Sequence, residues 1–325
     1  MKKKQASILA LCAAVALGAA SLGGCSVGEA VHEGVTAVAD SVSKPARFDT
    51  SGTIEQTTML DNDVLTVIAE SLEYRNDVAY LKLSLTNNTE GDIYVSTATL
   101  GYSPNYVNDC MVDMGHVSCD IPAGETVEEE TYFSLNELQL YGVRKIGVLG
   151  LGLRATDEEN NVFKDTAEIM TSLSGSEGVD SSTCVGFIDN PALAEKLAYE
   201  ITPASSIVHD LGDAGIEIPA AFLLVNKDGE QVVIAELKNN ADEALIVQTS
   251  NVAIDGALAY EGLWSQDAIA PGKRLVLDCL RLNRIAEKGE KEIDLSNVEE
   301  VGMKVTLKDD NGNTVLDPVD VIFTL

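Results

Sequence analysis

The sequence predicts an all-β protein made of two tandem antiparallel β-sandwiches. Three observations support this fold class: apolar and polar residues alternate along short segments, one block of sequence occurs twice, and turn-forming residues separate the segments. Alternation is typical of a strand with one buried face, because successive side chains of a strand point to opposite faces. Short strands at regular spacing with polar turns are typical of a sandwich.

The alternation is clearest in two segments. Residues 81–85 read Leu-Lys-Leu-Ser-Leu, and residues 301–307 read Val-Gly-Met-Lys-Val-Thr-Leu. Turn residues lie between such segments, at Asn87-Asn88, Asn226–Gly229 and Asn311-Gly312. Asn and Gly adopt the backbone conformations that tight turns need. We therefore expect each alternating segment to be a strand with its apolar residues facing a core.

One block of sequence occurs twice. The segment Asn87–Val95 matches Asn239–Val247 at an offset of 152 residues (239 minus 87). Further on, Ile121–Glu125 matches Ile269–Lys273 at an offset of 148, which indicates a difference in loop length. The offset of 152 then returns, because Leu149, Leu151, Leu153 and Leu173 match Val301, Met303, Val305 and Leu325. We infer two copies of one unit, each expected to bury its own core.

The duplication and the flanking composition divide the chain. We expect a signal peptide in residues 1–24, a tether in 25–52, a first copy in 53–173, a linker in 174–204 and a second copy in 205–325. The tether carries valines at helical spacing, but β-branched residues interrupted by glycine form a weak helix. A loosely helical stalk is expected there, and a coiled-coil dimerisation stalk is the alternative.

The linker has two parts. It opens with Ser-Gly-Ser-Glu-Gly, a composition typical of flexible connections. Asn190 and Pro191 then provide an N-cap and a first helical residue. These residues predict a short helix that ends at Tyr199.

The N-terminus has the three-part layout of a secretory signal. Lys2–Lys4 give a positive start, and an almost uncharged apolar run extends from Ala6 to Leu22. Leu22-Gly23-Gly24-Cys25 resembles the lipobox read by lipoprotein signal peptidase, whose cysteine takes a diacylglycerol thioether. The resemblance implies a lipoprotein with acyl chains such as palmitate, anchored through Cys25 on the outer face of the cell membrane. A plain secretory signal with an unrelated cysteine is the alternative.

The mature chain is strongly acidic. The formal net charge is −30, and removal of residues 1–24, which hold three lysines and no acid, makes it −33. Such a surface repels phosphate backbones, so nucleic acid is a poor partner. It would suit cations, basic peptides or simply solubility. No segment after residue 24 approaches the roughly 18 apolar residues of a membrane-spanning helix, so the lipid is the expected anchor.

Four cysteines follow the lipobox: Cys110, Cys119, Cys184 and Cys279. They have neither the density of a disulfide scaffold nor the close pairs of a zinc site. Eight residues separate Cys110 from Cys119, and a hairpin between them would be compatible with a disulfide. The second copy has Leu258 and Asp267 at the corresponding positions, so the fold does not require that bond. The sequence leaves the redox state of the four thiols open.

The sequence carries no common catalytic motif. The three histidines, His32, His116 and His209, are not in metal-ligand spacing, and no nucleophile elbow or phosphate-binding loop occurs. The segment Asp309–Asp320 superficially resembles a calcium loop, but its glycine is fourth instead of sixth and its last residue is Asp instead of Glu. We expect no enzyme activity, no metal and no cofactor, although catalytic triads can be dispersed in sequence.

The two copies also resemble a family. The resemblance lies in the Asn87-Asn88 turn and in the segments Val107–Val112, Ser118–Glu125 and Val148–Asp157. These are similar to the immunoglobulin-like or telokin-like domains of secreted lipoproteins in Gram-positive bacteria. The family commonly has Val-Asn-Gly-Tyr-Met-Val where this chain has Val107-Asn108-Asp109-Cys110-Met111-Val112. The resemblance implies immunoglobulin-like sandwiches and does not imply an activity.

The expected function is therefore a non-catalytic binding or structural role at the cell envelope, with a protein, a peptide or an envelope polymer as partner. An accessory subunit of an envelope transporter or enzyme complex is the alternative. The copies differ most in residues 97–116 and 249–264, and loops can diverge without unfolding a sandwich. Tyr102, Tyr106 and Trp264 in these stretches are candidate partner contacts. The alternative is that these aromatic rings anchor the loops against the core.

Overall fold

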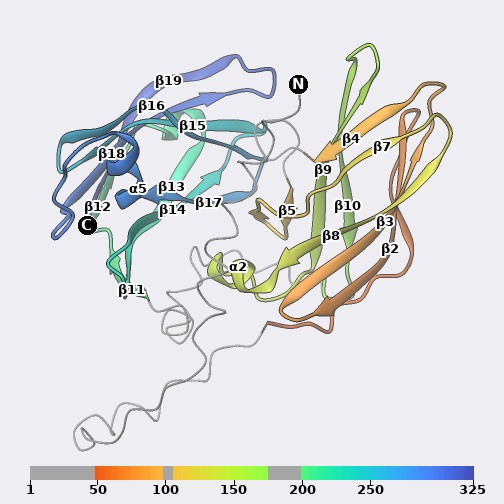
Figure 1. Cartoon of the computed structure of the whole chain (residues 1–325), viewed down its shortest axis with the longest axis horizontal. Coiled ribbons are helices and arrows are strands. Elements are labelled where there is room, and N and C mark those ends of the chain that lie inside the picture. Colours follow the sequence, from red (N-terminus) through yellow and green to blue (C-terminus); the bar gives the residue numbers. More distant parts are fainter. Residues whose placement is uncertain (1–47, 98–104, 175–198) are drawn as a thin grey trace, which may run out of the picture. The chain divides into compact units, whose positions relative to one another are not determined.

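The strands follow the alternating segments of the sequence. The structure is a computed structural model, which describes residues 48–97, 105–174 and 199–325 (Figure 1). Its elements are mostly antiparallel strands, so the predicted all-β fold is confirmed. The predicted signal peptide, the predicted stalk up to residue 47 and most of the predicted linker lie outside the described residues. Tyr199, the predicted helix end, begins a strand. Within the described part, no helix is both long and apolar enough to cross a bilayer.

A four-stranded antiparallel sheet is formed by strands of the first copy. Its order is β1 (Thr57–Asp61), β2 (Leu65–Arg75), β3 (Val78–Asn87) and β8 (Thr126–Ser134). In β3, Leu81, Leu83 and Leu85 are buried and Lys82 is exposed, as the alternation predicts. The outer face of this sheet is polar, because every second residue is free to face solvent.

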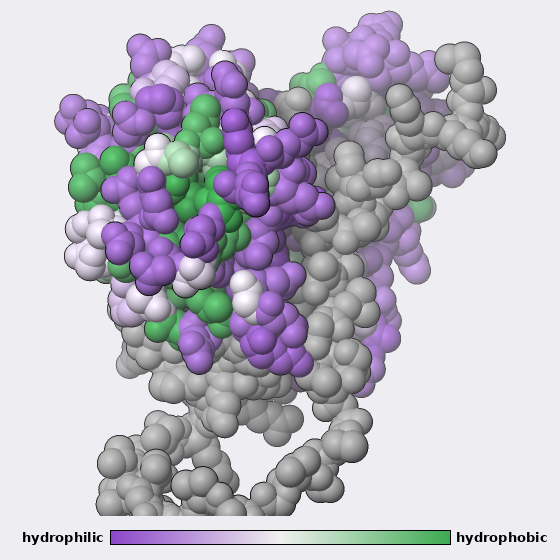
Figure 2. All heavy atoms as spheres, turned by 60° about the vertical axis from the view of Figure 1, so that its left-hand side comes forward, coloured by the Kyte–Doolittle hydropathy of each residue, from purple (hydrophilic) through white to green (hydrophobic). Residues whose placement is uncertain are grey.

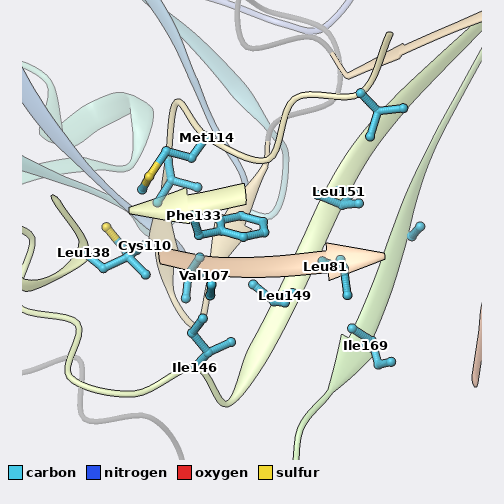
Figure 3. Packing of buried hydrophobic residues seen from close by; sticks show 14 of the residues in the cluster. Leu81, Val107, Cys110, Met114, Phe133, Leu138, Ile146, Leu149, Leu151 and Ile169 are labelled. Carbon is cyan, nitrogen blue, oxygen red and sulfur yellow. The ribbon is translucent and has the colours of Figure 1, made fainter. Parts of the chain in front are cut away.

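The opposing strands of the first copy are β4 (Ile93–Thr97), β5 (Tyr106–Val107), β6 (Cys110–Met111), β7 (Ser118–Ile121), β9 (Val148–Asp157) and β10 (Val162–Met170). β10 pairs with β9 without a register shift. β4 and β5 pair with different parts of β9, and they pair in turn with β7 and β6. Leu81 of β3, Phe133 of β8 and Leu149 of β9 gather in the core of the first copy (Figure 3).

The second copy has two sheets as well. One contains β11 (Tyr199–Pro203), β13 (Ile216–Asn226), β14 (Gln231–Asn239) and β17 (Arg274–Arg281). The other has the order β12 (Ser206–Val208), β19 (Thr314–Thr324), β18 (Glu300–Lys308), β15 (Leu245–Ile254) and β16 (Ala257–Ile269). A 3-10 turn, η2 (Gly212–Ala214), precedes β13. β11 lies in the stretch predicted as linker.

A short helix follows the corresponding strand in each copy. α2 (Leu135–Leu140) follows β8, and α5 (Leu282–Lys288) follows β17. The Ser134 hydroxyl caps α2 by accepting a hydrogen bond of 3.3 Å from the Glu137 amide. α5 buries Leu282, Ile285 and Ala286, which share one face at helical spacing. Neither helix was expected from the period-two pattern.

The duplicated Asn-Asn turn makes the same buried hydrogen bonds in both copies. The Asn87 side-chain amide donates to the carbonyls of Gly91 (2.7 Å) and Ile121 (3.0 Å). At the sequence offsets noted above, the Asn239 amide donates to the carbonyls of Glu243 (2.8 Å) and Ile269 (3.0 Å). Both asparagines are fully buried. The repeated residue therefore satisfies the backbone of a turn in each copy.

The two copies share one sheet. β17 pairs in parallel with β6, through Arg274 opposite Cys110 and Leu275 opposite Met111. This pairing joins the sheet of the second copy to the strands around β9, and the result is a ten-stranded sheet. The described residues, 48–97, 105–174 and 199–325, all belong to one compact unit. The division into domains at 53–173 and 205–325 stays a prediction.

The strands β13, β14 and β17 are buried on both faces. One face contributes Ala221, Leu223, Val233, Ala235, Leu237, Leu275 and Leu277 to the core of the second copy. The other face contributes Phe222, Leu224, Val232, Ile234 and Val276 to the cluster that contains the core of the first copy. We call these last five residues the second-copy outer face. The prediction of one separate core per copy is therefore wrong for this face.

Candidate functional site

The predicted site residues fall in three groups. Cys25, Tyr102 and Cys184 lie outside the described residues. Cys110, Cys119 and Cys279 are free thiols. Tyr106 and Trp264 lie on strands instead of loops.

Cys110 and Cys119 do not form the hairpin that a disulfide would need. Cys110 pairs with Val107, which is opposite Leu149 in β9. Cys119 pairs with Val95, which is opposite Ala155 in the same strand. Six residues of a strand span about 20 Å, whereas a disulfide allows about 7 Å between α-carbons. The disulfide that the sequence left open is therefore not formed, and both thiols are buried.

Tyr106 is a core residue and not an exposed contact. It is 7 % exposed, and its ring lies so close to Gly150 that a Cβ there would come within 2.1 Å of the ring carbon Cζ. Its hydroxyl donates a hydrogen bond to Glu168. Lys273 Nζ lies 3.8 Å from the ring centroid, a cation–π geometry, and donates to the Asn108 carbonyl at 2.9 Å. Tyr106 thus serves the contact between the copies, and the prediction of an exposed partner contact is wrong.

Trp264 lies on β16 and is partly buried. Its ring meets Tyr260 edge-on at a centroid distance of 5.1 Å, and its Nε1 donates to the Cys279 carbonyl at 3.0 Å. Lys288 Nζ of α5 lies 4.9 Å from the ring centroid. These contacts anchor the indole against the protein, which is the alternative that the sequence left open.

The same strand exposes two leucines. Leu258 is 47 % exposed and Leu263 is 55 % exposed, and β16 is the last strand of its sheet. Figure 2 shows hydrophobic side chains among hydrophilic ones on the face that it presents. We call Leu258, Tyr260, Leu263 and Trp264 the β16 apolar residues. Contiguous exposed apolar side chains mark interaction sites, and an edge strand also offers unpaired backbone groups to another chain.

A buried arginine ties the two copies together. Arg274 of β17 is 3 % exposed, and its Nε lies 3.2 Å from Asp109 Oδ2 of the first copy. Its Nη1 lies 3.4 Å from Glu236 Oε2 on β14. The Arg274 backbone amide also donates to the Asp109 carbonyl at 2.8 Å. A charge so far from water requires such partners.

Carboxyl groups gather beside this contact. Glu137 of α2 and Asp267 of β16 both have a pKa raised to about 7, first because burial disfavours the charged form and then because Asp278 is near. Burial also raises the pKa of Asp278 on β17. Asp113, which follows β6, adds to the negative field at all three groups. We call Asp113, Glu137, Asp267 and Asp278 the carboxyl cluster.

The thiols near the carboxyl cluster are poor nucleophiles. Burial raises the pKa of Cys110 to about 12, and it raises the pKa of Cys279 further. The reactive thiolate is therefore scarce at neutral pH. Among the residues that the structure describes, no group of three or more His, Cys, Asp or Glu side chains is arranged to hold a metal ion.

A cavity of about 550 Å³ opens between the two sheets of the second copy. Its lining includes Leu223, Val225, Gln231 and Val298. Gln231 Oε1 is buried without a hydrogen-bond partner. One unpaired acceptor in a mixed lining does not define a class of ligand.

Comparison with known proteins finds similarity only to distantly related solved structures. No protein-family model matches the chain, and no curated protein matches it. Among solved structures, it is similar to a red sea bream transglutaminase, with 10 % identity and a TM-score of 0.22 over 80 % of this chain and 31 % of the other. A GH2 beta-galacturonidase from Eisenbergiella tayi, bound to galacturonate, gives 9 % identity and a TM-score of 0.19 over 76 % and 35 %.

A calcium-binding mutant of Bacteroides uniformis beta-glucuronidase 2 gives 12 % identity and a TM-score of 0.18 over 83 % of this chain and 28 % of the other. The chain thus spans about a third of the length of these proteins.

Proposed function

We propose that this chain is an exported lipoprotein, held at the outer face of the cell membrane through Cys25. The observation that carries the proposal is the order of its N-terminus. Three lysines precede an uncharged apolar run, and Leu22-Gly23-Gly24-Cys25 ends it. The β-sandwich body that follows is a fold well suited to an extracytoplasmic position, since many cell-surface proteins use it.

We further propose that the body has a non-catalytic binding or structural role at the envelope. The exposed leucines on β16 support a binding role, because they place apolar side chains on the edge of a sheet. The raised pKa of the buried thiols supports the non-catalytic part. The family suggested by the sequence, immunoglobulin-like domains of surface lipoproteins, belongs to the same proposal, and the strand content of the fold is compatible with it.

The membrane anchor is tested by changing its cysteine. Cys25→Ser should abolish labelling by a clickable fatty acid and move the protein out of the membrane fraction, because serine cannot form the thioether. Cys12→Ser is the matched control, since Cys12 lies inside the apolar run without a lipobox and should leave both readouts unchanged. Unchanged labelling and fractionation of Cys25→Ser would show that the lipobox interpretation is wrong.

A further inference from the structure

The carboxyl cluster lies where the two copies meet. Two of its members belong to the first copy, Asp113 after β6 and Glu137 on α2. The other two belong to the second copy, Asp267 on β16 and Asp278 on β17. Each copy thus brings two acids to the same place, where like charges disfavour each other's ionisation.

One hydroxyl connects the two copies within this cluster. Tyr141 Oη lies 3.1 Å from Asp278 Oδ2 and 3.3 Å from Glu137 Oε1. A phenol has a single proton, so it can donate only one of these hydrogen bonds. Both bonds form together only when a carboxyl group supplies a second proton. Burial raises the pKa of Tyr141 well above its usual value, so the phenol keeps its own proton.

The groups around the carboxyl cluster do not fully neutralise its negative charge when all four carboxyl groups are ionised. Some neighbours oppose part of the rise in pKa: the Tyr141 hydroxyl and then Arg281 act on Asp278, and the Ser265 hydroxyl acts on Asp267. His116 Nε2 lies 3.6 Å from Asp113 Oδ1 at the exposed side. Cys110 and Cys279 are neutral thiols at physiological pH, because burial raises the pKa of each. These groups offset only part of the repulsion among four carboxylates.

We propose that the carboxyl cluster makes the contact between the two copies depend on pH across the neutral range. With an extra proton in the cluster, Glu137 and Asp278 both bond to Tyr141, and α2 is held against β17. Without it, one hydrogen bond is lost and four carboxylates repel one another, so the contact loosens. Acidification should therefore strengthen the contact.

The direction of the pH effect follows from the difference in proton binding between the folded and unfolded states. Glu137 and Asp267 have a pKa of about 7 in the folded protein, whereas carboxyl groups in an unfolded chain titrate near roughly 4. Between these values the folded state binds more protons than the unfolded state, so stability falls as pH rises. The loss is complete above about pH 7, and acidification below about pH 4 brings no further gain from these groups.

The test compares the full chain at about pH 5.5 and about pH 8. The unfolding equilibrium constant from urea titration should rise on the order of a thousandfold between them, about thirtyfold for each of the two carboxyl groups. In the double variant Glu137→Gln with Asp267→Asn the rise should be much smaller, because the amides do not titrate. Glu128→Gln, an exposed acid on β8, is the matched control and should behave like the parent. A double variant with the parent's full pH dependence would overturn the proposal.

A second measurement needs no variant. Hydrogen exchange of the parent, corrected for the intrinsic effect of pH, should show α2 and β17 losing protection at the higher pH while β2 and β3 keep theirs. A uniform loss, or no loss in α2 and β17, would also overturn the proposal. This readout remains valid if the double variant does not fold.

Discussion

Arg274 shows how much one residue can contribute to the contact between the copies. Its guanidinium lies between Asp109 and Glu236, and Glu236 is itself 3 % exposed. Asp109 Oδ1 is buried without a hydrogen-bond partner, so the Asp109 carboxylate depends on Arg274 to offset its removal from water. Removing the arginine would leave two carboxylates close together and poorly solvated. That arrangement is among the most costly in a protein interior.

Arg274→Met should therefore lower the free energy of unfolding by about 3–5 kcal/mol. The matched control is Lys304→Met, which removes an exposed ion pair of 2.8 Å to Asp320. Exposed pairs contribute about 0–1 kcal/mol, so this variant should be nearly as stable as the parent. Urea titration measures both. Equal losses in the two variants would mean that the buried pairs have no special role.

The sequence predicted the position of individual residues only where the same structural role occurs in both copies. The Asn-Asn turn and the leucines of β3 occupy the positions that the sequence indicates. Tyr106 could not be placed, because its burial depends on Gly150 and on Lys273 from the other copy. Arg274 was also missed, although the offset of 148 aligns it with Thr126, a neutral residue. The signal in the sequence was that the second copy has a charged residue at a position where the first copy has a neutral one.

At the scale of elements, the strands that join the copies differ from their counterparts in one way. Val232, Ile234 and Val276 of the second-copy outer face align with Tyr80, Lys82 and Glu128 of the first copy. The first-copy residues lie on the polar outer face of a sheet, and their counterparts are buried. Residues 221–225 and 232–235 are continuous apolar runs, which are typical of strands buried on both faces. Comparing the copies position by position would have predicted this face.

β16 is the element from which a partner contact is expected. Leu258→Ser with Leu263→Ser should reduce cross-linking of the protein to a specific envelope partner, because both changes remove exposed apolar surface. Val315→Ser on β19, where the valine is 48 % exposed, is the matched control and should retain the partner. Thermal melting should change little in either variant. Retention of all partners by the leucine variant would exclude β16 as the contact.

At the scale of the whole molecule, the second-copy outer face makes the copies interdependent. A separated fragment 199–325 would expose Phe222, Leu224, Val232, Ile234 and Val276 to water. Exposed apolar patches of this kind favour self-association. We expect this fragment to aggregate, or to melt below the full chain, and to be rescued by fragment 48–174. Light scattering and thermal unfolding of the separate and mixed fragments measure this.

A substituted fragment provides the control. Val232→Tyr, Ile234→Lys and Val276→Glu give fragment 199–325 the outer residues of the first copy, and they should make it soluble without a partner. If the unsubstituted fragment is monomeric and as stable as the full chain, the copies are independent and the face is not an interface.

The shared ten-stranded sheet has a consequence for how such a chain can evolve. Tandem repeats are usually gained, lost or exchanged one at a time by recombination. Here a deletion of the first copy would uncover the second-copy outer face, and it would also leave Arg274 without Asp109 and β17 without β6. A descendant with only the second copy would be prone to aggregate and would be removed by selection. We therefore expect the two copies to be inherited together, because each buries surface that the other would leave exposed.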